Sequence, residues 1–97
     1  MPTYITLANW TDQGIRNVKE SSQRLDAARK AVEAAGGKWL GFYMTMGRYD
    51  MVVIIEAPGD EVASAVLLAI GSGGSIRTET LRAYPEAEYR KIIAGLP

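Results

Sequence analysis

The chain has 97 residues, carries 11 basic and 11 acidic side chains, and has a formal net charge of zero. This length fits one domain, and the balanced charge gives no long-range attraction to nucleic acids or membrane surfaces, so neither is expected as a partner. The chain contains no Cys and no His. Their absence excludes disulfides, thiolate chemistry and the usual haem and transition-metal ligands, so we expect no metal and no cofactor. No apolar segment is long enough to span a bilayer and no signal sequence is recognisable, so a cytoplasmic location is expected.

Hydrophobic periodicity, capping residues and glycine breaks predict four strands and four helical segments. In chain order they are a strand at 3–9, a short helix at 12–19, a helix from Ser21 or Ser22 to Ala35, strands at 38–46 and 49–57, a helix at 61–70, a strand at 76–84 and a helix beginning at Pro85. Thr11 and Asp60 can cap the helices that follow them. This order, βαββαβ with an added C-terminal helix, predicts a single domain over 1–97 of the α+β class, with a ferredoxin-like antiparallel sheet and its helices on one face.

Glycine-rich segments separate several of these elements. Gly36 and Gly37 end the long helix, and one of them is expected to adopt the left-handed conformation. The segment 71–75 reads Gly-Ser-Gly-Gly-Ser and follows a helix, whereas a phosphate-binding loop precedes one. We therefore interpret this segment as a connector.

The two middle strands are apolar on both faces. Alternation places Met51, Val53 and Ile55 opposite Val52 and Ile54 in the third strand, and Leu40, Phe42, Met44 and Met46 opposite Trp39 and Tyr43 in the second. The helices of this fold can cover only one face of the sheet, and a bare apolar face of this size is unusual on a monomer. The sequence therefore predicts a homodimer or higher homo-oligomer with sheets packed face to face, the alternative being a monomer whose C-terminal helix crosses the second face.

The hairpin between these strands is the strongest candidate for a site. Gly47 and Arg48 form the turn, and Tyr49 and Asp50 lead into the apolar strand. Partial loss of water there would make the Asp50 carboxylate a better general base, and Tyr49 can direct its hydroxyl group toward a ligand. The alternatives are structural: Asp50 can bind backbone N–H groups of the turn, Tyr49 can pack its ring beside the hairpin, and Arg48 can be solvated.

Two further pairs are candidates for ligand binding. Arg77 and Glu79 share a face of the fourth strand, where the guanidinium can hold a carboxylate through two hydrogen bonds; an ordinary ion pair is the alternative. Asn9 and Trp10 follow the first strand, where Trp10 can form the wall of a pocket between sheet and helices, or instead cover the first helix as a hydrophobic lid. Aromatic residues that can line the same cavity, but are more typical of a core, are Trp39, Phe42 and Tyr43.

Three separated segments resemble the GYD-domain family of small proteins. They are 9–16, 46–50 and 77–83, of which the second contains Gly47-Arg48-Tyr49-Asp50, similar to the Gly-x-Tyr-Asp signature of the family. The resemblance implies a ferredoxin-like subunit of the dimeric α/β-barrel kind, but the family has no established activity. A more distant likeness to the effector-binding domain of Lrp/AsnC regulators implies a ligand site near the hairpin; this chain has no helix-turn-helix segment, so it gives no DNA-binding role.

Three functions are compatible with these features. The first is a small oligomeric protein that binds a small organic ligand, as carrier or sensor, near the hairpin of Gly47–Asp50. The second is a cofactor-independent isomerase or monooxygenase-like enzyme with Asp50 as general base. The third is a structural assembly module.

Overall fold

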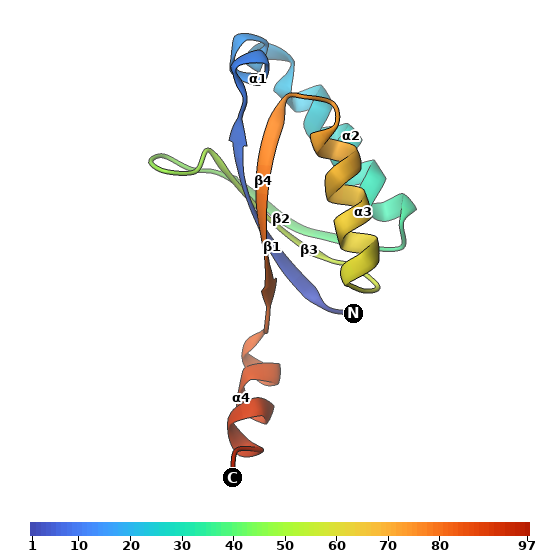
Figure 1. Ribbon diagram of the computed structural model, residues 1–97, viewed down its shortest axis with the longest axis vertical. Coiled ribbons are helices and arrows are strands. Elements are labelled where there is room, and N and C mark those ends of the chain that lie inside the picture. The colour runs from blue at the N-terminus through green and yellow to red at the C-terminus, as the bar shows by residue number, and fades with distance from the viewer.

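The computed structural model describes all 97 residues and pairs four strands in the order β2–β3–β1–β4, all antiparallel to their neighbours (Figure 1). The elements are β1 (Thr3–Trp10), α1 (Asp12–Arg16), the 3-10 helix η1 (Val18–Glu20), α2 (Ser21–Ala34), β2 (Lys38–Met44), β3 (Met51–Glu56), α3 (Asp60–Gly71), β4 (Ile76–Ala83) and α4 (Glu86–Ala94). Helices α2 and α3 lie on one face of the sheet. The predicted α+β, ferredoxin-like fold is confirmed. No helix combines the length and the apolar composition needed to cross a membrane.

The central strand β1 has one face against the helices and one face free of them. Tyr4, Thr6 and Ala8 are buried beneath α2 and α3, while Ile5 and Leu7 alternate onto the opposite face and are only half-buried. Ile5 lies beside Ile54 of β3 and Leu81 of β4, and Leu7 lies beside Val52. We call this helix-free side of the sheet the outer face.

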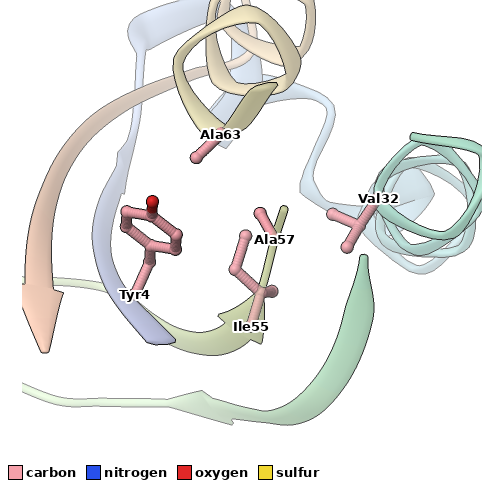
Figure 2. Close-up of a cluster of buried hydrophobic side chains, with 5 residues drawn as sticks. All are labelled: Tyr4, Val32, Ile55, Ala57 and Ala63. Atoms are coloured by element: carbon pink, nitrogen blue, oxygen red, sulfur yellow. The ribbon is translucent and has the colours of Figure 1, made fainter. Parts of the chain in front are cut away.

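A small hydrophobic core lies at the end of the sheet where β1 begins. Figure 2 shows its five members, which come from both inner strands, the segment after β3 and both helices: Tyr4, Val32, Ile55, Ala57 and Ala63. Only 10 of the 97 residues are buried, so this cluster fills one end of the space between sheet and helices and leaves the rest less tightly filled.

A β-bulge in β2 changes which of its residues share a face. Trp39 is opposite Ile55, but Gly41 rather than Leu40 is opposite Ile54, so Leu40 is the additional residue. The grouping of Leu40 with Phe42 was therefore wrong. Trp39 and Phe42 face the helices, and Leu40, 52% exposed, does not.

Helix capping agrees with the sequence only in part. The Thr11 hydroxyl oxygen accepts a hydrogen bond from the Gly14 N–H, as predicted, and Gly36 takes a positive φ of 87° after α2. Ser21 does not cap α2, because η1 runs directly into that helix. Asp60 is the first residue of α3 rather than its cap, and its carboxylate instead accepts a hydrogen bond from the buried Tyr4 hydroxyl at 2.5 Å.

Helix α4 continues beyond the end of the sheet and does not fold back onto the outer face (Figure 1). The molecule consequently extends 52 Å along its longest axis but only 17 Å along its shortest. The apolar side of this helix, formed by Tyr89, Ile92 and Ile93, is exposed, as is Leu96 just beyond its end. The outer face therefore has no cover from this chain.

Candidate functional site

A cavity of about 590 Å³ lies between the sheet and helices α2 and α3. Of the 25 residues that line it, 18 are hydrophobic. At one end it meets the core cluster near Ile55, and at the other it reaches Trp10, Ile76 and the connector after α3. This volume and lining are typical of sites that bind small organic molecules.

Small side chains explain why the space is not filled. The inward side of α2 presents Ala28 and Ala31, and the sheet opposite presents Thr6, Ala8 and Thr78. Five short side chains facing one another cannot meet across the distance between a helix and a sheet, which is about 10 Å. The cavity is thus a consequence of the sequence.

The cavity has very few strong polar groups. Arg24 is the only charged residue in its lining, and its guanidinium donates to the backbone carbonyl oxygens of Gly14 at 3.3 Å and Asn17 at 3.2 Å. Trp39 lines the cavity as well, and its indole Nε1 is buried without a hydrogen-bond partner. The Arg29 guanidinium lies 5.5 Å from the centre of the Trp39 ring but does not line the cavity.

Most of the residues proposed for a site gather elsewhere, at the outer face beside the hairpin. The Asp50 Oδ2 oxygen accepts a hydrogen bond from the Trp10 N–H at 3.1 Å. The Asp50 N–H donates both to the Asn9 Oδ1 oxygen and to the Ala8 carbonyl oxygen, each at 3.0 Å. Asp50 and Asn9 together thus tie the hairpin to the last residues of β1. The backbone N–H that the Asp50 carboxylate binds is that of Trp10 in β1 and not one of the turn itself.

Tyr49 and Glu79 form a second contact in this outer-face cluster. The Tyr49 hydroxyl donates to the Glu79 Oε2 oxygen at 2.6 Å. This hydrogen bond is the main cause that raises the pKa of Tyr49 above its ordinary value, followed by desolvation. Glu79 therefore pairs with a phenol and not with Arg77, which lies opposite Asn9 on β1 and makes no ion pair.

The remaining candidates are Gly47, Arg48 and Trp10. Gly47 and Arg48 are exposed at the hairpin, where Gly47 adopts a φ of 107° and the Arg48 guanidinium lies 5.8 Å from the centre of the Tyr49 ring. Trp10 connects the two regions, since its side chain lines the cavity while its backbone N–H binds Asp50. No group of three or more acidic side chains comes together to form a metal site.

The chain resembles known proteins over nearly its whole length. The model of the GYD domain family matches residues 4–93. A Thermus thermophilus protein named "Glutamine synthetase and cystathionine beta-lyase binding protein" is 32% identical over 89 residues, covering 91% of this chain and 94% of that protein. The crystal structure of TTHA0845, from the same species, has a TM-score of 0.55 and 27% identity, covering 88% of this chain and 99% of that one.

Proposed function

The chain belongs to the GYD domain family, and on this premise we propose that it is a binding protein whose cavity between sheet and helices holds a small organic molecule. The observation that carries this proposal is the apolar space of about 590 Å³ behind the sheet. The cavity extends to Met44 and Met51, the residues on either side of the hairpin, so a ligand there would lie near the segment expected from the sequence.

The energetic argument rests on apolar surface. Water in a cavity lined by leucine, isoleucine, valine and alanine side chains has few hydrogen-bond partners, so an organic molecule that replaces it gains about 25 cal/mol for each Å² removed from water. Only Val32 and Ile55 belong to both the cavity lining and the core cluster, so most of the lining side chains lie outside the packed core. A bound molecule would therefore complete the interior and stabilise the fold through linkage.

A cavity-filling variant tests this proposal. The neutral dye N-phenyl-1-naphthylamine, which fluoresces in apolar surroundings, is expected to bind the wild-type chain with a stoichiometry of one. Ala28→Leu puts three more carbon atoms into the cavity and should weaken binding by about tenfold through overpacking. Ala34→Leu adds the same group at an exposed position of α2 outside the cavity and should leave binding unchanged. Equal binding by both variants, or none by the wild type, would overturn the proposal.

Protein binding is a second candidate function, favoured by the name of the Thermus relative. Helix α4 is the element we propose for it, because a helix of nine residues is marginal in water unless its apolar side packs against something. Ile92 and Ile93 are each 48% exposed. Helix α4 projects away from the sheet and from the other helices, which therefore do not cover it (Figure 1). An exposed amphipathic helix of this kind suits insertion into a groove of a partner.

A pull-down can test this role directly. Full-length chain on a resin is expected to retain glutamine synthetase from its own organism, and the double variant Ile92→Ser/Ile93→Ser is expected to lose it. Leu68→Ser, which removes an apolar residue that is 75% exposed on α3, serves as the control on another helix. Retention of the enzyme by the α4 double variant would exclude this helix as the docking element.

Self-association through the outer face is a separate part of the proposal. Val52 and Ile54 of β3 and Leu7 of β1 form an apolar strip there that neither α4 nor any other element covers. A second copy placed face to face would bury this strip by symmetry.

Cofactor-free catalysis with Asp50 as the base is the rival to a binding role. The substitution Asp50→Asn, discussed below, separates the two.

A further inference from the structure

Arg24 is half-buried and lines one end of the cavity between sheet and helices, whereas all other basic residues of the chain are exposed. We propose that its guanidinium binds the carboxylate of an amphipathic ligand, a medium-chain monocarboxylate whose apolar tail lies in the cavity. This inference rests on the proposed function. It specifies the chemical class of the molecule that the cavity takes and the direction in which that molecule lies.

The Arg24 guanidinium lies where α1, α2 and the connector after α3 come together. It donates to the backbone carbonyl oxygens of Gly14 at 3.3 Å and Asn17 at 3.2 Å. The backbone of Gly14 lies in turn against Ser75, since a Cβ atom on Gly14 would be 1.9 Å from the Ser75 carbonyl oxygen. Ser75 also lines the cavity, so these contacts hold the guanidinium at the rim.

No carboxylate of the chain neutralises this charge. The ion pair of the chain joins Arg90 to Glu86 in α4, and no acidic residue lines the cavity. The two carbonyl oxygens occupy two of the five N–H groups of the guanidinium and carry no formal charge, so the other N–H groups can bind a carboxylate. Arg29 is a second cation on α2, but it is exposed and does not line the cavity.

The serines of the lining gather at the same end. Ser21 and Ser22 lie in the first turn of α2, and Ser75 lies in the connector. Ser22 is exposed, so the rim reaches water. At the opposite end the lining includes Val32 and Ile55, which belong to the core cluster shown in Figure 2. A carboxylate at the rim keeps part of its water, so it loses less hydration than one at the apolar end.

Helix α2 gives the length of the tail. From Ser22 at the rim to Val32 at the core cluster it rises about 15 Å, at about 1.5 Å per residue. Between these two residues the helix presents Ala28 and Ala31 to the cavity, and their short side chains leave room for an extended chain. A saturated chain such as that of decanoate fits this distance, with its carboxylate at the rim and its methyl end at the core.

Three molecules of equal length and different head-group charge test this proposal: decanoate, decanamide and decylamine. At neutral pH the first is an anion, the second is neutral and the third is a cation. Isothermal titration calorimetry should show that the wild-type chain binds decanoate about tenfold more tightly than decanamide. Decylamine should bind more weakly than decanamide, because its ammonium group would lie beside the Arg24 guanidinium.

The variant Arg24→Gln removes the charge and keeps a side-chain amide. It should bring the ratio of decanoate to decanamide affinity close to one, and an unchanged affinity for decanamide would show that its cavity is intact. Arg29→Gln is the matched control, since it removes the same charge from the same helix outside the cavity lining, and it should preserve the ratio. Arg24→Lys keeps the charge without the paired N–H groups and should give an intermediate ratio.

The failures of this inference and of the proposed function are distinguishable. If none of the three molecules binds, both fail together. If decanamide binds and decanoate binds no more tightly, the cavity is a ligand site that takes no carboxylate at its rim. An undiminished ratio in Arg24→Gln, or a ratio lost equally in Arg29→Gln, would overturn the assignment of Arg24 as the anchor.

Discussion

The carboxylate of Asp50 lies 3.1 Å from the backbone nitrogen of Trp10 and accepts its hydrogen bond, which joins the hairpin to the end of the central strand. Trp10 is also part of the cavity wall. A residue first considered as a catalytic base is thus positioned to fix the backbone beside the proposed ligand site. Its role can be separated from catalysis because Asn has an oxygen that accepts the same hydrogen bond.

We expect Asp50→Asn to keep the fold and the oligomeric state, with a loss in the free energy of unfolding below about 1 kcal/mol. Asp50→Ala leaves the Trp10 N–H without its acceptor and should cost about 1–2 kcal/mol. Urea unfolding monitored by tryptophan fluorescence measures both. A substrate whose turnover disappears in Asp50→Asn while its binding persists would favour the enzymatic alternative instead.

Val52→Lys should separate the proposed dimer into monomers. Val52 is opposite Leu7 in the middle of the outer face, so a lysine there would bring two like charges into the centre of a symmetric interface. Sedimentation velocity at micromolar concentration should give twice 10.6 kDa for the wild type and 10.6 kDa for the variant.

The matched control for this variant is Leu68→Lys. Leu68 is 75% exposed on the helical side of the molecule, so the substitution adds the same charge without touching the outer face. This control should sediment as the wild type does. A wild-type chain that sediments as a monomer would contradict the proposed self-association.

Gly14→Ala should destabilise the chain by about 2 kcal/mol through overpacking. A Cβ atom at Gly14 would lie 1.9 Å from the Ser75 carbonyl oxygen, and this backbone is held in place by a hydrogen bond from the Thr11 N–H. Gly59→Ala is the control, because its Cβ would meet no atom within 4 Å. The two variants should differ in urea midpoint; equal midpoints would show that the connector moves freely.

The sheet could be predicted from the sequence because its signals are local and repeated. Tyr4, Thr6 and Ala8 alternate with Ile5 and Leu7, and that period alone assigns both faces of β1 correctly. The bulge at Leu40 was not predictable in the same way, since an inserted residue changes the register without any change in composition. The capping role given to Asp60 failed for a related reason: its partner, Tyr4, is 56 residues away.

The candidate site could be predicted less well than the fold. Motif residues drew attention to Asp50, Tyr49 and Asn9, and the structure does place these side chains in one neighbourhood. The cavity depends instead on the small size of residues such as Ala28, which no motif marks. The unpartnered N–H of Trp39 is visible only when the neighbours of that ring are known.

Stability should fall at high pH because of two phenols. The pKa of Tyr4 is raised above its ordinary value of about 10, first by burial and then by its hydrogen bond to Asp60, and the pKa of Tyr49 is raised by its hydrogen bond to Glu79. The folded state therefore holds protons that the unfolded chain releases above pH 10. The stabilisation from these two phenols is complete below about pH 10 and is lost as the pH rises toward the pKa values of the folded state.

Urea midpoints measured between pH 8.5 and 11 should decline in the wild type, less steeply in Tyr4→Phe, and least in the double variant Tyr4→Phe/Tyr49→Phe. An undiminished decline in that double variant would assign the effect to other groups.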